Sequence, residues 1–173
     1  MALMDSIKQM AKQNIKHIVL AEGTEPRTVE AAGIIAKEGL AKVTLLGNPD
    51  EVVKVANGKS LDGVTVIDPE KSEKFEERKK MFYYDIKKSG KRIKELRKAK
   101  GITLGQAQQQ IKDPLYFATM MIKCQDADGM VAGAINSTGN TIRPALQIIK
   151  TKPGVKTVSG AFLMEVPNCT LGE

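Results

Sequence analysis

Short apolar runs alternate with helical patterns along the first part of this chain. The runs Ile18–Ala21, Val43–Leu46 and Val64–Ile67 are each followed by glycine, proline or acidic residues. Between them, apolar residues recur with helical spacing from Pro26 to Gly39 and over 50–56. Such short, uniformly apolar strands are typical of a parallel sheet, in which helices return the chain from one strand to the next. The alternation therefore predicts an α/β fold with a parallel sheet covered on both faces.

Capping residues predict where several helices begin and end. Thr24 is the candidate N-cap of the helix after the first strand, Pro26 occupies an early helical position, and Gly39 is a natural left-handed C-cap. Further helices are predicted over 5–13, over 72–100 with an interruption at Ser89-Gly90, over 105–112 after a Thr103 cap, and from Asp113-Pro114 onward.

The last apolar stretch, Thr157 to Met164, predicts a strand that no helix follows. A crossover normally returns the chain to the sheet, so we interpret the sequence as the front portion of a longer protein. We expect residues 1–150 to form an N-terminal α/β domain and residues 151–173 to begin a second domain.

Composition narrows the class of protein. No apolar run is long enough to cross a bilayer, and the first 16 residues do not have the pattern of an export signal, so a cytoplasmic protein is expected.

The net charge of +7 points to anionic partners. About half of the Lys and Arg residues fall between positions 71 and 100, interleaved with acidic residues as on a solvated, salt-bridged helix. Without aromatic stacking residues or a recognisable nucleic-acid motif, nucleic acid is an unlikely partner.

The residues that commonly bind metals are sparse. Cys124 and Cys169 lie far apart in sequence, without CxxC spacing, and are expected to be free thiols. His17 is the single histidine of the chain and is interpreted as structural, because a metal site normally needs several such ligands. We expect no metal site.

The stretch from Ala127 to Pro144 predicts a phosphate site. It reads as a buried strand that runs into a loop rich in hydroxyl and amide groups, followed by a helix over Pro144 to Ile149 with Arg143 at its start. Helix N-termini offer unsatisfied N–H groups and partial positive charge, and arginine adds a planar fork for phosphate oxygens. The candidate binding residues here are Ser137, Thr138, Asn140, Thr141 and Arg143.

Several separated motifs resemble those of the phosphate acetyltransferase family. They occur in the family's order, and the resemblance runs from about Ile18 to Asn168; the motifs are Ile18–Arg27, Val43–Asn48, Arg97–Thr103 and Thr141–Thr151.

The resemblance implies an enzyme that converts acetyl phosphate and coenzyme A into acetyl-CoA and inorganic phosphate. It also implies a parallel-sheet, three-layer α/β sandwich of the isocitrate/isopropylmalate dehydrogenase-like kind, two domains with the active site between them, and a homodimer. Coenzyme A is then a substrate, and no bound cofactor is expected. Family members are about twice as long as this chain, and their catalytic aspartate, arginine and serine belong to the C-terminal half. The resemblance therefore implies that no catalytic residue lies within this chain and that the chain alone is inactive.

Arginines in the resembling motifs are candidates for substrate binding. Arg97 and Arg143 match family positions associated with coenzyme A. Arg27 also follows a strand at a helix start and could face the same cleft, or it could pair with a nearby glutamate. Many relatives carry histidine where Asn136 stands and an acidic residue where Asn140 stands. Amides carry no charge, so these two positions are expected to bind rather than to act as acids or bases.

Three alternatives to acetyl transfer stay open from the sequence. Phosphate butyryltransferases share the fold and much of the loop, and the acyl pocket cannot be recognised from these residues. Similar domains fused to malic enzymes are thought to sense acetyl-CoA without catalysis. Nucleic-acid binding through the basic run would show a steep salt dependence.

Overall fold

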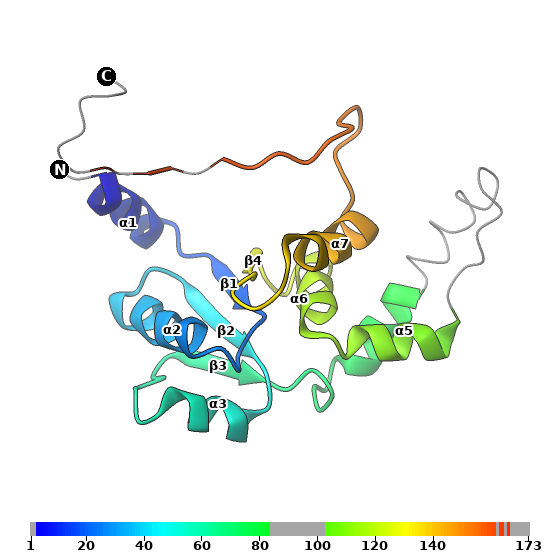
Figure 1. Ribbon diagram of the computed structural model, residues 1–173, viewed down its shortest axis with the longest axis horizontal. Helices are drawn as coiled ribbons and strands as arrows, with labels where there is room; N and C mark the ends of the chain where they lie inside the picture. The colour runs from blue at the N-terminus through cyan, green and yellow to red at the C-terminus, as the bar shows by residue number, and fades with distance from the viewer. Residues whose placement is uncertain (1–2, 84–102, 162, 165, 167–173) are drawn as a thin grey trace.

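A four-stranded parallel sheet forms the centre of the molecule. The computed structural model describes residues 3–83, 103–161, 163–164 and 166 (Figure 1). The strands lie in the order β3-β2-β1-β4 and all pairings are parallel. This arrangement confirms the predicted α/β class with a parallel sheet. The strand bounds are His17–Leu20 for β1, Lys42–Leu46 for β2, Val64–Ile67 for β3 and Gly129–Val131 for β4.

Helices connect these strands, as the sequence predicts. The structure also gives a helical stretch over 75–83, whereas the rest of the predicted 72–100 helix lies outside the described residues. None of the helices that the structure describes is both long and apolar enough to cross a membrane. The labelled helices are α1 Leu3–Gln13, α2 Pro26–Glu38, α3 Pro49–Ala56, α5 Leu104–Ile111, α6 Pro114–Lys123 and α7 Thr138–Ile148.

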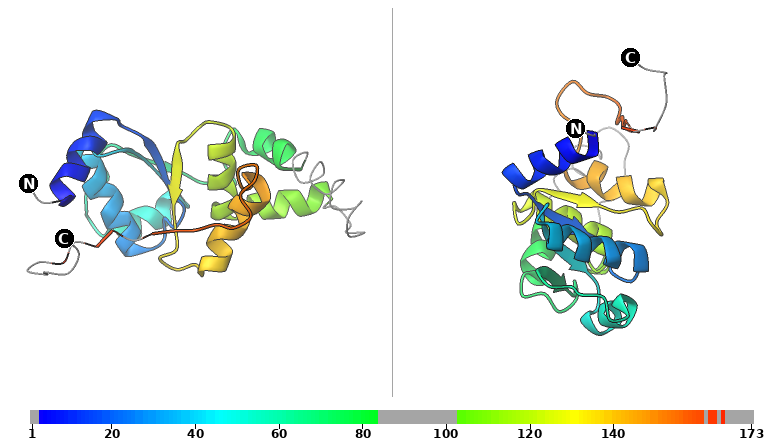
Figure 2. Two further views of the ribbon diagram at one scale, coloured as in Figure 1. Left: turned by 90° about the horizontal axis from the view of Figure 1, so that it is seen from above. Right: turned by 90° about the vertical axis from the view of Figure 1, so that its left-hand side faces the viewer.

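The helices lie on both faces of the sheet (Figure 2). Successive residues of a strand point to opposite faces, so each strand contributes to two apolar clusters. Leu20 and Leu45 pack with residues of α2 and α3, including Val29 and Val52. Val19 and Leu46 belong to the other cluster, which is built from α5, α6, α7 and the helical stretch over 75–83. The sheet is therefore covered on both faces, as expected.

The ends of α2 show one correct and one wrong prediction. Gly39 ends the helix in the left-handed conformation with φ 64°, as predicted. The N-cap, however, is Glu25 and not Thr24. Pro26 is the first helical residue, and the residue before a proline is confined to extended backbone, which is the conformation that an N-cap requires.

Local signals in the second half of the chain are strong, and two predicted helix starts are confirmed. Thr103 and Gln106 form a reciprocal capping box, so α5 starts within one residue of its predicted position. Asp113 caps α6, and Pro114 follows in the first turn.

The start of α7 differs from the prediction. The helix begins at Thr138, because the Ser137 hydroxyl accepts a hydrogen bond from the Asn140 N–H at 3.3 Å. Arg143 therefore lies in the second turn rather than the first, and Pro144 lies inside the helix. Proline has no N–H for the carbonyl of the residue four positions back, but the capping serine still determines where the helix starts.

Two strand predictions also need correction. The strand at the start of the 127–144 stretch is only half-buried, and Val131 is 61% exposed, because β4 is an edge strand with a single neighbour. The predicted strand over 157–164 is wrong. Its described residues are exposed and pair with none of the four strands, and without a partner a strand has no ladder of hydrogen bonds.

Candidate functional site

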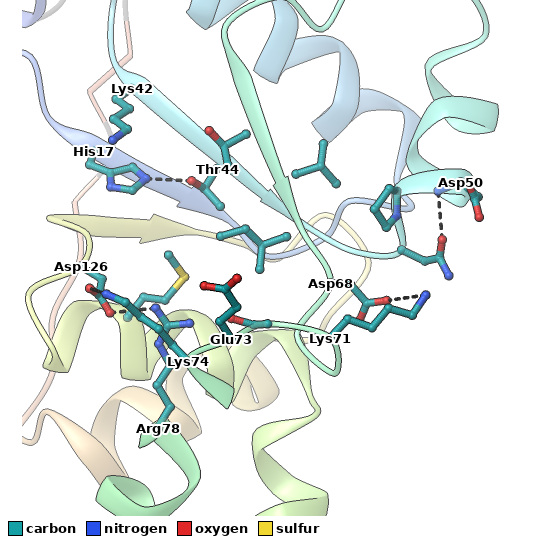
Figure 3. Close-up of a pocket in the computed structure, with 17 residues that line it drawn as sticks. His17, Lys42, Thr44, Asp50, Asp68, Lys71, Glu73, Lys74, Arg78 and Asp126 are labelled. Carbon is teal, nitrogen blue, oxygen red and sulfur yellow. Dashed lines mark hydrogen bonds and ion pairs between the residues drawn. The ribbon is translucent and has the colours of Figure 1, made fainter. Parts of the chain in front are cut away.

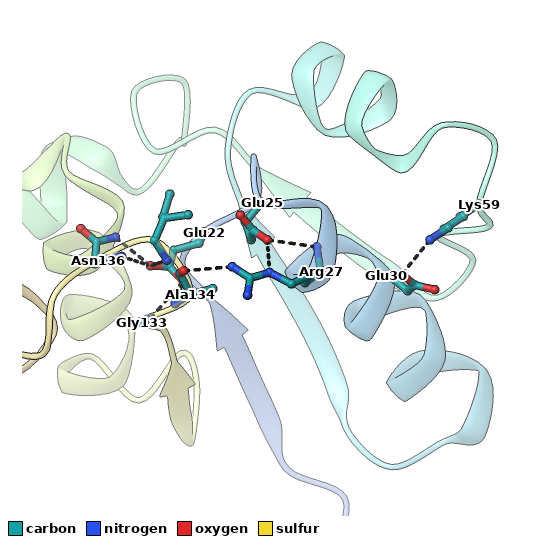
Figure 4. A network of polar contacts seen from close by, with 9 residues as sticks. Glu22, Glu25, Arg27, Glu30, Lys59, Gly133, Ala134 and Asn136 are labelled. Carbon is teal, nitrogen blue, oxygen red and sulfur yellow. Dashed lines mark hydrogen bonds and ion pairs between the residues drawn. The ribbon is translucent and has the colours of Figure 1, made fainter.

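The carboxyl ends of β1 and β4 lie side by side at the point where the strand order reverses. From β1 the chain continues to β2 and β3 on one side and later returns to β4 on the other side. In open parallel sheets, ligands bind outside the carboxyl ends of strands at such a switch point. Two segments meet here: residues 22–27 after β1 and residues 132–137 after β4 (Figure 4).

Glu22 follows β1 directly and is only 4% exposed. Its Oε2 accepts hydrogen bonds from the N–H groups of Gly133 and Ala134 at 3.0 and 2.7 Å. Its Oε1 accepts from the N–H groups of Ile135 and Asn136 at 3.2 and 3.0 Å, and from Nδ2 of Asn136 at 2.8 Å. Four consecutive backbone N–H groups and one amide therefore converge on a single buried carboxylate.

We call the N–H groups of residues 133–136 the loop nest. Consecutive N–H groups that point inward form a concave site for an anion. Gly133 has φ 111°, a backbone conformation that favours glycine and lets the chain turn around the carboxylate. The nest is an anion site, and its anion is a side chain of the same chain.

The environment of Glu22 keeps it ionised. Burial by itself would raise the pKa of the carboxyl, but hydrogen bonds from the Asn136 side chain and from backbone N–H groups outweigh burial and lower the pKa. Glu22 is therefore poorly suited to donate a proton at neutral pH. Asn136 likewise contributes hydrogen bonds and no acid or base, in keeping with its amide side chain.

Arg27 reaches the same loop from the first turn of α2. Its Nη2 donates to the Ala134 carbonyl at 3.1 Å, and its Nε contacts Glu25 Oε1. The side chain is 75% exposed. Arg27 thus pairs with a nearby glutamate, which is one of the two interpretations from the sequence, and it lies beside the loop that leads to α7. That it faces a substrate cleft stays a prediction.

The remaining predicted residues gather on the first two turns of α7. Ser137, Thr138 and Asn140 are exposed. The Thr141 hydroxyl donates to the Ser137 carbonyl at 3.1 Å, so its proton is already in use. Thr138, Gly139, Ile142, Arg143, Leu146 and Gln147 line a shallow groove along this face.

Arg143 is the positively charged residue of this group. It is exposed, and no carboxylate among the described residues forms a salt bridge with it. Its guanidinium can therefore donate two parallel hydrogen bonds to the oxygens of a phosphate or a carboxylate. Arg97, the other arginine matched to coenzyme A binding, lies outside the described residues.

The cavity next to the nest is acidic. It lies outside the carboxyl ends of β1, β2 and β3, where Lys112 pairs with Glu70 at 2.7 Å. This surplus of negative charge disfavours phosphate there and favours the α7 side. The carboxylates that line this cavity are Glu22, Glu51, Asp68, Glu70 and Asp113.

A larger cavity of about 660 Å³ lies between the β2–β3 face of the sheet and the segment 68–78 (Figure 3). Asp126 binds two cations at its wall, Lys74 and the 3% exposed Arg78. His17 hydrogen-bonds the Thr44 hydroxyl at 2.8 Å, which is the structural role expected of it. Arg78 is buried, whereas the basic run was predicted to be a solvated surface, because Asp126 and the face of Phe117 enclose it.

The described residues contain no group of three or more metal-binding side chains. Cys124 is a free thiol, and burial raises its pKa. Cys169 lies outside the described residues. The site residue that the sequence failed to single out is Glu22. Its position in the sequence could have identified it. A carboxylate that follows a buried strand directly and precedes a glycine lies at the carboxyl end of the sheet and needs hydrogen-bond donors there.

Comparison with known proteins identifies the family. The family described as phosphate acetyl/butaryl transferase matches residues 2–172 of this chain. The chain therefore belongs to that family, in agreement with the resemblance found in its motifs.

The relatives are longer than this chain. It is 51% identical to the phosphate acetyltransferase of Thermoanaerobacterium thermosaccharolyticum, with 100% of this chain and 49% of the relative covered. It is 48% identical to that of Acetivibrio thermocellus, with 99% and 48% covered. The chain spans about half the length of the curated relatives it matches.

Solved structures agree with the fold. A phosphotransacetylase from Streptococcus pyogenes superposes with a TM-score of 0.82 at 35% identity, covering 97% of this chain and 49% of that one. EutD phosphotransacetylase from Staphylococcus aureus gives 0.76 at 33% identity, covering 90% and 44%.

Proposed function

We propose that the protein takes part in the exchange of acetyl between phosphate and coenzyme A, in which acetyl phosphate and coenzyme A give acetyl-CoA and inorganic phosphate. Membership of the family and relatives named phosphate acetyltransferase support this proposal. The observation that carries it for this chain is the fixed start of α7, where Arg143 is open to a ligand among the described residues. The role of these residues is binding of phosphate or phosphoryl oxygens.

Five side chains, those of the cap Ser137 and of four α7 residues, have different chemical roles in this task. Ser137 and Thr138 are exposed hydroxyls that can donate to phosphate oxygens, and the Asn140 amide can do the same. Thr141 contributes by holding the Ser137 carbonyl and not by donating to a ligand, because its proton is committed to that bond. Arg143 supplies the positive charge.

Arg27 and Arg97 complete the proposed binding set. Arg27 stands beside the loop with most of its side chain exposed, so part of its guanidinium can reach a bound anion. Arg97 is proposed from its motif alone. The catalytic residues are proposed to lie outside this chain, which by itself binds substrate and does not turn it over.

Further properties follow from the family resemblance and are proposed with it. They are an isocitrate/isopropylmalate dehydrogenase-like three-layer fold, a division into residues 1–150 and the start of a second domain at 151–173, a homodimer, and a cytoplasmic location. No bound cofactor or metal is proposed. The named relatives favour acetyl over butyryl as the transferred group.

Calorimetric titration and a thioester assay test this proposal together. Coenzyme A is titrated into the 173-residue chain, and acetyl phosphate is then added while thioester formation is followed. We expect coenzyme A to bind and no thioester to form. The same chain joined to the second half of the Thermoanaerobacterium thermosaccharolyticum enzyme is expected to form thioester. Turnover by the 173-residue chain would place the catalytic residues within it, and an absence of coenzyme A binding would contradict the proposed role.

A further inference from the structure

We propose that Glu22 is a positioning residue, whose carboxylate fills the loop nest and thereby fixes the start of α7 and leaves substrate phosphate to the open side of that helix. The part that concerns substrate rests on the proposed function. The part that concerns the loop rests on geometry alone.

The first step in the argument is that the carboxylate is saturated. An ionised carboxylate offers about four lone-pair sites on two oxygens. The two oxygens of Glu22 receive five donors at 2.7 to 3.2 Å. No acceptor site is left for a substrate hydroxyl, so the function left to Glu22 is to hold its donors in place.

The second step is that the carboxylate is itself held firmly. Gly23 donates its N–H to the Leu46 carbonyl at 3.0 Å at the end of β2. The approach is so close that a Cβ at position 23 would lie 2.5 Å from that carbonyl oxygen. Glu22 therefore projects from backbone tied to the centre of the sheet, and the edge loop takes its position from the sheet through this one side chain.

The third step is that residues 22–27 contact the loop a second time, through Arg27. Arg27 donates to the Ala134 carbonyl, while Glu22 accepts from the Ala134 N–H. Residues 22–27 thus hold both backbone groups of one loop residue across a sequence separation of more than 100 residues. We call the contacts of Glu22 and Arg27 with this loop the clamp. Ser137 follows the nest directly and caps α7, so the clamp sets where the helix begins.

The consequence for ligands is a choice between two neighbouring anion sites. Four inward N–H groups would bind a phosphate well, but they are occupied. Unless Glu22 is removed, an external anion has to use the side chains of the proposed binding set and cannot use the N–H groups of the nest. Without Glu22, the nest becomes a vacant site for a small carboxylate.

Amide hydrogen exchange and coenzyme A binding test the clamp. The variants Glu22→Gln and Glu22→Ala are compared with the wild-type chain and with Glu51→Gln, an exposed carboxylate at the same edge. Because hydrogen bonds to a charged group are worth about 1.5–3 kcal/mol, exchange at residues 133–136 is expected to accelerate at least about tenfold in both Glu22 variants. Exchange at Val19 and Leu45 in the core should stay slow, and Glu51→Gln should match the wild type.

Chemical rescue separates positioning from a general loss of structure. Formate added to Glu22→Ala is expected to restore slow exchange at residues 133–136 and to recover coenzyme A affinity, whereas neutral formamide is not. Asn136→Ala, which removes one donor and leaves the carboxylate in place, should give a smaller acceleration and keeps the test informative if Glu22→Ala does not fold.

Two results would overturn the proposal. One is exchange at residues 133–136 that stays as slow in Glu22→Gln as in the wild type. The other is accelerated exchange in Glu22→Ala that formate leaves unchanged. A wild-type chain that binds no coenzyme A would contradict the proposed function and not the clamp. In that case, the effect of formate on amide exchange at residues 133–136 in Glu22→Ala would still show whether the carboxylate holds the loop.

Discussion

Two buried ions of opposite charge stabilise different parts of this protein in different ways. Glu22 is 4% exposed and Arg78 is 3% exposed. Glu22 is surrounded by uncharged donors, four of them backbone N–H groups. Arg78 bonds Asp126 at 2.7 Å and lies 4.4 Å from the centre of the Phe117 ring. Within the described residues, its Nε and Nη1 have no hydrogen-bond partner.

The comparison shows that a buried charge can be stabilised without a direct salt bridge. Complete hydrogen bonding replaces the water that Glu22 loses, so no cation has to form a salt bridge with it. Arg78 is incompletely hydrogen-bonded and depends on a single carboxylate, which Lys74 shares. Glu22 therefore shapes a site that remains open for a ligand, whereas Arg78 belongs to an ion cluster in the wall of the larger cavity.

The largest expected effect is on stability, from Asp126→Asn. This change leaves Arg78 buried without its counter-ion, and breaking a buried pair typically costs about 3–5 kcal/mol. We expect about 3 kcal/mol in the free energy of unfolding, the low end, because the Asp126 side chain is 22% exposed. Urea unfolding measures it.

The matched control for that change is Glu30→Gln. Its pair with Lys59 is about half exposed, with side chains 50% and 54% accessible, so the expected loss is only about 0–1 kcal/mol. Equal losses in the two variants would mean that burial does not distinguish the Arg78 cluster from a surface pair.

The next effect is on binding, from Arg143→Ala. Removal of this open cation should weaken coenzyme A binding about ten- to a hundredfold, since a charge-assisted hydrogen bond contributes roughly 1.5–3 kcal/mol. Stability should change little, because Arg143 is exposed, in contrast to Arg78. Calorimetric titration checks the affinity. Lys54→Ala, an exposed lysine at the far end of α3, is the control, and a loss as large as that in Arg143→Ala would indicate a nonspecific charge effect.

Gly23→Ala tests how firmly the backbone that carries Glu22 is held against the end of β2. The added Cβ would lie 2.5 Å from the Leu46 carbonyl oxygen, so the backbone that carries Glu22 has to shift. Overpacking of this kind costs about 1–3 kcal/mol in unfolding free energy, measured by thermal or urea unfolding. Gly139→Ala meets nothing within 4 Å inside α7 and should be neutral or stabilising by up to about 1 kcal/mol. A Gly23→Ala chain as stable as the wild type would show that this contact relaxes freely.

The smallest expected effect is a pH dependence. The folded pKa of Glu22 is lowered, so the unfolded state binds its proton more readily, and stability falls as acid protonates the folded carboxylate. The contribution is complete above the ordinary glutamate pKa of about 4.3 and is lost as the pH falls below it. Urea unfolding of the wild type and Glu22→Gln over this range should converge in acid. Curves that stay parallel would assign the acid sensitivity to other groups, such as Asp126, whose pKa is also lowered.

Predictions from the sequence succeeded where the signal is local. The Thr103 capping box and the Asp113-Pro114 start depend on contacts within a few residues, and both were confirmed. The predicted strand over 157–164 failed, because a strand depends on a partner that its own residues cannot specify. The sequence predicts the correct helix for Arg143 but the wrong turn, because the helix begins after the Ser137 cap and not at Pro144.

The sequence alone determined the class of fold, the family and the set of polar residues at α7, since these follow from hydrophobic period, motifs and caps. Only the tertiary structure decided which anion fills the loop nest. Glu22 and its donors are 111 to 114 positions apart, and they meet because β4 pairs with β1 rather than with another strand. Strand order is set by packing over the whole chain, so no local stretch of sequence contains it.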